Sequence, residues 1–77
     1  MTIETLIEYI KQGREIEFRL GKRNYFHSFD GEKYTLYDEL SKEFVFEGDL
    51  KDELKFEFQE NISFGKSINL FRFDYIL

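Results

Sequence analysis

Residues 15–38 read EIEFRLGKRNYFHSFDGEKYTLYD, and their pattern predicts three antiparallel strands joined by two tight turns. In the first strand, Ile16, Phe18 and Leu20 alternate with charged residues, which is typical of a strand with one buried face. Gly21 then stands first in a two-residue loop, where the missing Cβ allows a positive φ. The predicted strands span residues 15–20, 23–29 and 32–38.

The two turns also predict which residues lie opposite each other. The first loop gives three cross-strand pairs: Leu20 with Arg23, Phe18 with Tyr25, and Ile16 with His27. A second two-residue loop at Asp30-Gly31 gives two more: His27 with Tyr34, and Tyr25 with Leu36. One sheet face then collects the core residues, namely Ile16, Phe18, Leu20, Tyr25, Phe29, Tyr34 and Leu36.

The chain before residue 15 predicts a helix over 2–12, because its apolar residues follow helical spacing. Thr2 is a suitable N-cap and Gly13 a suitable stop. This helix is short, so it needs tertiary support, and its apolar stripe is expected to pack across the core face of the sheet.

Beyond the third strand we predict a fourth strand over 43–47 and a helix over 49–60 that Asp49 caps. Leu50, Leu54 and Phe58 share one face of that helix. The alternation of residues 55–58 is a competing strand signal. A short helical turn capped by Ser67 and a terminal strand over 70–77 complete the prediction, with Phe71, Phe73, Tyr75 and Leu77 at alternate positions.

These elements predict an α+β fold: a small antiparallel sheet of four to five strands, packed against the N-terminal helix and a second, short acidic helix. With 77 residues and no linker-like tract, residues 1–77 are expected to form a single domain. Ten Phe and five Tyr are expected to supply most of its core.

Two motifs carry a resemblance to a known group of proteins. They are Glu15-Ile16-Glu17-Phe18 running through Gly21 to Tyr25, and Phe64-Gly65-Lys66-Ser67-Ile68. With them the chain resembles small uncharacterised proteins of phages, prophages and plasmids in Gram-positive bacteria. Those proteins open with a short helix that leads into a G-(K/R)-E-I-E-F strand, and later carry an acidic helix and a GKS-(I/L) element. The resemblance implies a mobile-element setting and no defined activity.

Composition narrows the classes of function. The net charge of −5 opposes binding to nucleic acid through phosphate neutralisation. The chain has no Cys, no segment of membrane-spanning length and no signal-peptide pattern. We therefore expect a protein of the cytoplasm, the host's if phage-encoded, that binds neither membrane nor nucleic acid.

No motif predicts catalysis, a cofactor or a metal ion. Gly65-Lys66-Ser67 lacks the first glycine of a phosphate-binding loop, because Glu60 stands in its place. His27, the single histidine, would point to the opposite face of its strand from Ser28, so the two form no nucleophile and base pair. We predict that His27 packs beside Tyr25 and Tyr34, and that the chain is not an enzyme.

The strongest functional signal is charge. Residues 38–60 hold nine acids against three lysines. Such a field can steer a basic partner, although a solvated acidic helix that only keeps the protein soluble is the alternative. The acids predicted to bind the partner are Asp38, Glu39, Glu43, Asp49, Asp52, Glu53, Glu57 and Glu60.

Two non-enzymatic functions therefore stand side by side. In the first, the acidic segment imitates nucleic acid and blocks a basic host protein of defence or replication, as small anti-CRISPR and anti-restriction proteins do. In the second, the chain is a structural or assembly protein that forms a homodimer. Phe26 and Tyr37 lie opposite the predicted core face and, with Phe73, would form an aromatic surface for contacts.

Overall fold

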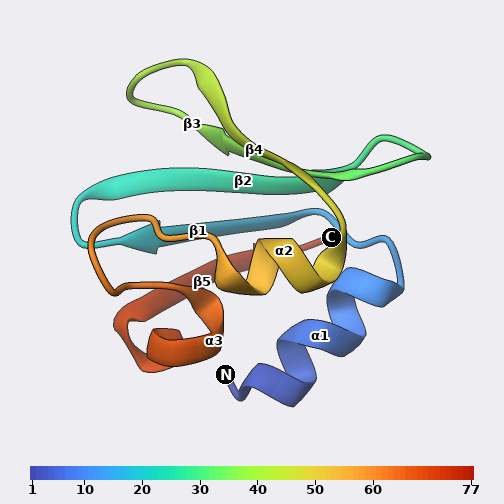
Figure 1. Cartoon of the computed structure of the whole chain (residues 1–77), viewed down its shortest axis with the longest axis horizontal. Coiled ribbons are helices and arrows are strands. Elements are labelled where there is room, and N and C mark those ends of the chain that lie inside the picture. The colour runs from blue at the N-terminus through green and yellow to red at the C-terminus, as the bar shows by residue number, and fades with distance from the viewer.

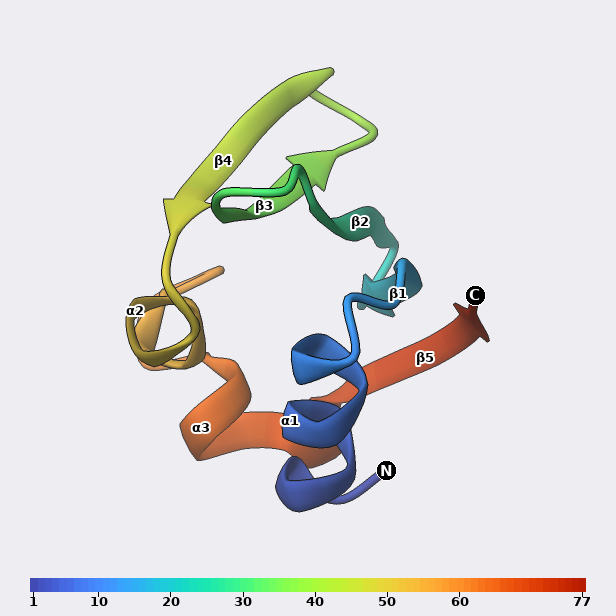
Figure 2. The same ribbon diagram turned by 90° about the vertical axis from the view of Figure 1, so that its right-hand side faces the viewer.

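The computed structural model describes residues 1–77 and has an α+β fold. Five strands form one antiparallel sheet in the order β4-β3-β2-β1-β5. The sheet curls, and all the helices lie on its concave side (Figure 2). The strands are β1 (Ile16–Leu20), β2 (Arg23–Phe29), β3 (Tyr34–Asp38), β4 (Glu43–Gly48) and β5 (Phe71–Ile76). The helices are α1 (Ile3–Lys11), α2 (Leu50–Lys55), α3 (Phe64–Ser67) and the 3-10 turn η1 (Ile68–Leu70).

The first hairpin has the predicted register. Ile16 pairs with His27, Phe18 with Tyr25 and Leu20 with Arg23. Gly21 has a φ of +62°, the left-handed conformation that made glycine the expected residue at the start of this loop.

The predicted register of the second hairpin is wrong by two residues. Phe29 pairs with Tyr34, and His27 pairs with Leu36 instead of Tyr34. The loop has four residues because the Asp30 carboxylate accepts hydrogen bonds from the backbone N–H groups of Glu32 and Lys33. A shift of two residues keeps every side chain on its predicted face, since strand side chains alternate with a period of two.

Phe18 lies at the centre of the core. Its ring is 5.2–5.9 Å from five other aromatic rings, those of Tyr25, Phe58, Phe64, Phe71 and Phe73. Helix α1 lies on the helical side of the sheet (Figure 1), and its buried residues Leu6 and Ile10 belong to the core. The predicted core face is confirmed for Ile16, Phe18, Leu20, Tyr25 and Leu36. Phe29 is 41% exposed and Tyr34 is half-buried.

The predicted helix over 49–60 is too long, because α2 ends at Lys55. The chain continues in an extended conformation at Phe56, and Phe58 donates a backbone hydrogen bond to Ile62. This reversal brings the Phe58 ring within 5.7 Å of Phe18 and 5.0 Å of Tyr25. The competing strand signal of residues 55–58 is not confirmed either, because Lys55 belongs to α2 and no strand covers residues 56–58. The half-buried Phe58 packs in the aromatic cluster instead of continuing the helix.

The ends of the chain follow the prediction with one correction. Thr2 caps α1 by accepting a hydrogen bond from the Thr5 N–H. The predicted short turn after Ser67 is η1, where Ser67 holds the N-cap position but its side chain makes no capping hydrogen bond. Residues 64–67 themselves form the unpredicted turn α3, which Ser63 caps by accepting a hydrogen bond from the Lys66 N–H. The terminal strand β5 is present and pairs with β1. None of the helices has the length and apolar character needed to cross a membrane.

Candidate functional site

One face of the sheet carries no helix (Figure 2). On this open face, one residue from each strand stands in a single row across the whole sheet. The row follows from direct cross-strand pairing and consists, from β5 to β4, of Tyr75, Glu17, Phe26, Tyr37 and Phe44. Four of its five members are aromatic. We call this set the aromatic row.

The ends of the aromatic row are strongly exposed. Phe44 is 59% and Tyr75 63% accessible to solvent, whereas Phe26 and Tyr37 are half-buried between their neighbours. Tyr37 and Phe44 meet edge to face with ring centroids 5.2 Å apart. Exposed aromatic side chains gathered on one surface are typical of a contact site.

The sequence located only the middle of the aromatic row. It placed Phe26 and Tyr37 on this face, which is confirmed, but it missed Phe44 and Tyr75. It also grouped Phe73 with the exposed aromatics, whereas Phe73 packs on Phe18 in the core. A register shift in each edge-strand pairing explains both misses, since an irregularity changes the face on which later side chains lie.

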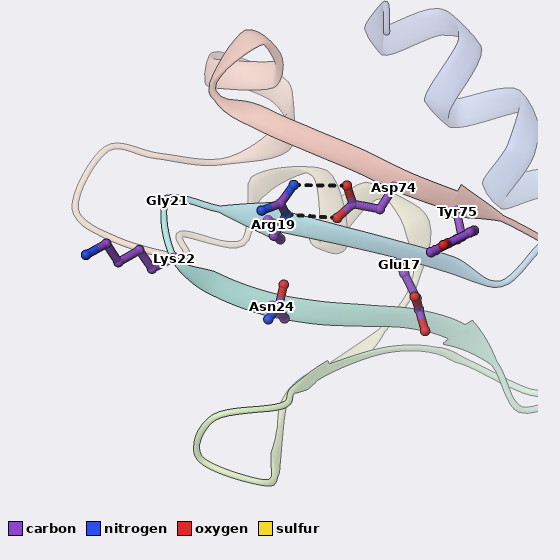
Figure 3. Close-up of a pocket in the computed structure, with 7 residues that line it drawn as sticks. All are labelled: Glu17, Arg19, Gly21, Lys22, Asn24, Asp74 and Tyr75. Atoms are coloured by element: carbon purple, nitrogen blue, oxygen red, sulfur yellow. Dashed lines mark hydrogen bonds and ion pairs between the residues drawn. The ribbon is translucent and has the colours of Figure 1, made fainter.

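The β1–β5 half of the open face is polar and contains a shallow depression of about 580 Å³ (Figure 3). Arg19 donates two hydrogen bonds to Asp74, from Nε at 3.0 Å and from Nη2 at 3.2 Å. Arg72 approaches the same carboxylate at 3.8 Å. The depression is lined by Glu17, Arg19, Gly21, Lys22, Asn24, Asp74 and Tyr75. Both signs of charge therefore stand beside the aromatic row.

Two of the acids predicted to bind a partner are buried, so that prediction is wrong for them. Asp38 accepts hydrogen bonds from Arg23 and from the backbone N–H groups of Leu40 and Ser41. Burial alone would raise the pKa of Asp38, but these donors outweigh it and the pKa is lowered. Asp38 thus fixes the start of the β3–β4 turn and has no free oxygen for a partner.

Glu53 is the second buried acid, with an exposed fraction of 0%. Its Oε2 lies 2.6 Å from Nδ1 of His27, which is 1% exposed. His27 stacks on Tyr34, as predicted, with ring centroids 5.7 Å apart. The sequence missed the partner of His27, although Glu53 shares a helix face with Leu50 and Leu54 by its spacing.

The remaining predicted acids are exposed but do not share one helix face. Glu43 and Asp49 lie at opposite ends of β4, a separation of roughly 20 Å for a strand of this length. Asp49 is engaged as the N-cap of α2 and Glu57 accepts a hydrogen bond from the Asn61 N–H. The exposed members are Glu39, Glu43, Asp49, Asp52, Glu57 and Glu60.

The structure brings together no group of three or more His, Cys, Asp or Glu side chains that could hold a metal ion. No protein-family model matches the chain, and comparisons with curated proteins and with solved structures find nothing similar. The geometry and charge of the open face are therefore the basis for a functional proposal.

Proposed function

We propose that this chain is a small assembly protein that forms a homodimer through the open face of its sheet. The observation that carries this proposal is the aromatic row, which spans all five strands on the one sheet face that no helix covers. A second copy seated over part of the aromatic row would remove apolar surface of its members, such as Phe44, from water.

Charge favours a second copy as the occupant of this face. The chain carries a net charge of −5, so most of its surface repels another copy. The polar half of the open face is the exception, because Arg19, Lys22 and Arg72 there offset Glu17 and Asp74. A two-fold axis that passes between Glu17 and Arg19 would bring each sign opposite the other, whereas a strongly basic partner would meet three cations here, Arg19, Lys22 and Arg72.

The sheet edges are poorer places for assembly. Each edge strand is joined to its neighbour with a register shift, in β4 opposite Leu36 and Tyr37 and in β5 opposite Glu17 and Phe18. Such bulges twist an edge and disrupt the row of backbone groups that another strand would need. Glu43 and Glu47 add like charges along β4.

The size of the open face fits a weak to moderate dimer. The two longer dimensions of the Cα trace are 28 and 27 Å, so a whole face of the molecule has a projected area of about 750 Å². Standard interfaces bury about 800 Å² per partner. The helix-free face is convex, so two copies would touch over only part of it, and we expect a dimer that dissociates on dilution.

Sedimentation equilibrium over a range of concentrations tests this proposal. The wild type should be a dimer at high concentration and dissociate on dilution, and Phe44→Ser should weaken association at least about tenfold. Phe29→Ser is the matched control, because Phe29 is also an exposed aromatic but lies on the other side of β2. A wild type that stays monomeric near about 1 mM contradicts the proposal, as does a Phe44→Ser variant with wild-type association.

A second candidate function is association of the acidic segment with a basic host protein. The observation that favours it is that six of the eight predicted acids remain exposed along β4, α2 and the segment after α2. Replacing Asp52, Glu57 and Glu60 with amides should then abolish low-salt capture of a nucleic-acid-handling protein from a Gram-positive lysate. Amides at Glu4 and Glu8 of α1 are the control, and equal capture by both variants contradicts this function.

A further inference from the structure

The only fully buried residue of α2 is a carboxylic acid, Glu53. Leu50 and Leu54, its apolar neighbours, are only partly buried. Helices are normally held on a sheet by apolar side chains. The six-residue helix α2 is therefore attached at its centre by the contact of Glu53 with His27.

The pair has one hydrogen bond and two unused atoms. His27 Nε2 and Glu53 Oε1 are buried and have no hydrogen-bond partner. No other charge compensates either group, because the ion pairs of the molecule place only Glu53 on His27. The other charged and titratable groups of the surrounding elements are exposed or paired with each other. The exposed groups are Lys51, Asp52 and Lys55 on α2 and Glu4, Glu8 and Lys11 on α1. Arg23 pairs with Asp38, Lys33 pairs with Glu47, and Tyr34 stacks on the imidazole of His27.

A short contact of this kind requires one proton between Nδ1 and Oε2. With one proton the pair is either imidazolium and carboxylate or imidazole and carboxylic acid, and both forms keep the hydrogen bond. With no proton, a lone pair on nitrogen faces a buried carboxylate. With two protons, a buried imidazolium faces a neutral acid. Both of the last states leave a buried charge without a partner, which is costly.

We propose that His27 and Glu53 form a proton-dependent latch that holds α2 on the sheet only while the pair carries one proton. In the unfolded or released chain, Glu and His have pKa values of about 4.3 and 6.5. Between these two pH values the released pair already carries one proton, so closing the latch neither takes up nor releases a proton. Above pH of about 6.5 the released chain carries none, and closing the latch must take up one proton. Burial raises the pKa of Glu53, which agrees with retention of that proton.

The sign of the pH dependence follows from this proton count. Stability from the latch is complete near pH 4.5 to 6.5 and falls as pH rises, until the folded pair itself loses its proton. The equilibrium constant for release should rise about tenfold per pH unit above about pH 7. Below about pH 4.3 the released chain binds two protons, and stability falls again.

Hydrogen exchange of the α2 amides between pH 6 and 8.5, corrected for the intrinsic pH dependence of exchange, tests the latch in the wild type and in Glu53→Gln. Glutamine can donate its N–H to neutral His27, so the variant requires no proton on the pair. Its protection should therefore rise with pH up to about 6.5, where the released histidine loses its proton, and stay constant above it, while wild-type protection decreases above about pH 6.5. Where release is coupled to global unfolding, chemical denaturation above about pH 6.5 should likewise show a free energy of unfolding that falls with pH in the wild type and is constant in the variant.

A third variant keeps the test decisive if Glu53→Gln fails to fold. The double substitution His27→Leu/Glu53→Leu removes both titrating groups and fills the site with hydrocarbon, so its α2 protection should lose the wild-type pH dependence above pH 6.5. Equal slopes in the wild type and in either variant would overturn the latch. A wild type whose α2 protection is constant from pH 6 to 8.5 would also overturn it.

Discussion

Replacing Phe18 with alanine is expected to lower the free energy of unfolding by about 3–5 kcal/mol. The phenyl ring of Phe18 is 1% exposed and contacts five aromatic rings, which come from β2, β5, α3 and the segment after α2. Its removal leaves a cavity that none of the ordered elements can fill. A chain of 77 residues has a total stability of about 4–12 kcal/mol, so the variant should be close to unfolded.

Chemical denaturation of three variants checks this expectation. Phe18→Leu keeps most of the volume and should lose less than Phe18→Ala, which preserves a measurable transition. Phe44→Ala lies on the open face and should change the free energy of unfolding by no more than about 0.5 kcal/mol in the monomer. Equal losses for Phe18→Ala and Phe44→Ala would show that the core is not centred on Phe18.

Breaking the buried pair from one side is the second change with a large expected effect. His27→Leu and Glu53→Leu should each cost about 3–5 kcal/mol at neutral pH, because each leaves one buried polar group without its partner. The double variant should be more stable than either single one, since two leucines can pack without any unsatisfied atom.

A double-mutant cycle measures this coupling. The account predicts an interaction energy above about 2 kcal/mol between the two positions. Additive losses, with the double variant less stable than either single one, would mean that His27 and Glu53 contribute through separate contacts. The cycle tests whether His27 and Glu53 interact directly, and this test needs measurements at only one pH.

The contrast between the two hairpins shows where sequence reasoning succeeds. The first loop needs a residue with positive φ at its first position, and Gly21 meets this need at once. The loop length and the register of the first hairpin therefore follow from the local sequence. At Asp30 the loop length depends on two side-chain hydrogen bonds to the backbone, which lengthen the loop from two residues to four. The composition of that turn did not distinguish the two lengths, so only the faces were predicted correctly.

Tertiary contacts decided the second helix. By spacing alone, Leu50, Leu54 and Phe58 fit one helical face. The ring of Phe58 instead joins the aromatic cluster around Phe18, and the chain leaves the helix to let it do so. A tertiary contact also places Glu53, one of the acids expected to bind a partner, in the core against His27. The sequence alone does not show that the buried His27 lies opposite Glu53 as its hydrogen-bond partner.

The candidate site was only half visible in the sequence for a related reason. Phe26 and Tyr37 follow from alternation in regular strands, whereas Phe44 and Tyr75 depend on irregularities in the two edge strands. Nothing in the local sequence of β4 or β5 indicates where the extra residue falls. The full aromatic row therefore emerges only from the paired sheet.

The central claim, that two copies meet through the open face, is tested most directly by mixing two charge variants. Five charged residues stand in or beside the depression, namely Glu17, Arg19, Lys22, Arg72 and Asp74. Arg19→Glu/Arg72→Glu makes all of them negative except Lys22, and Glu17→Lys/Asp74→Lys makes all of them positive. Sedimentation equilibrium should show each folded variant as a monomer alone and a heterodimer when the two are mixed, because like charges repel and opposite charges attract across the interface. Dimers of either variant alone, or a mixture that stays monomeric beside a dimeric wild type, would contradict the claim.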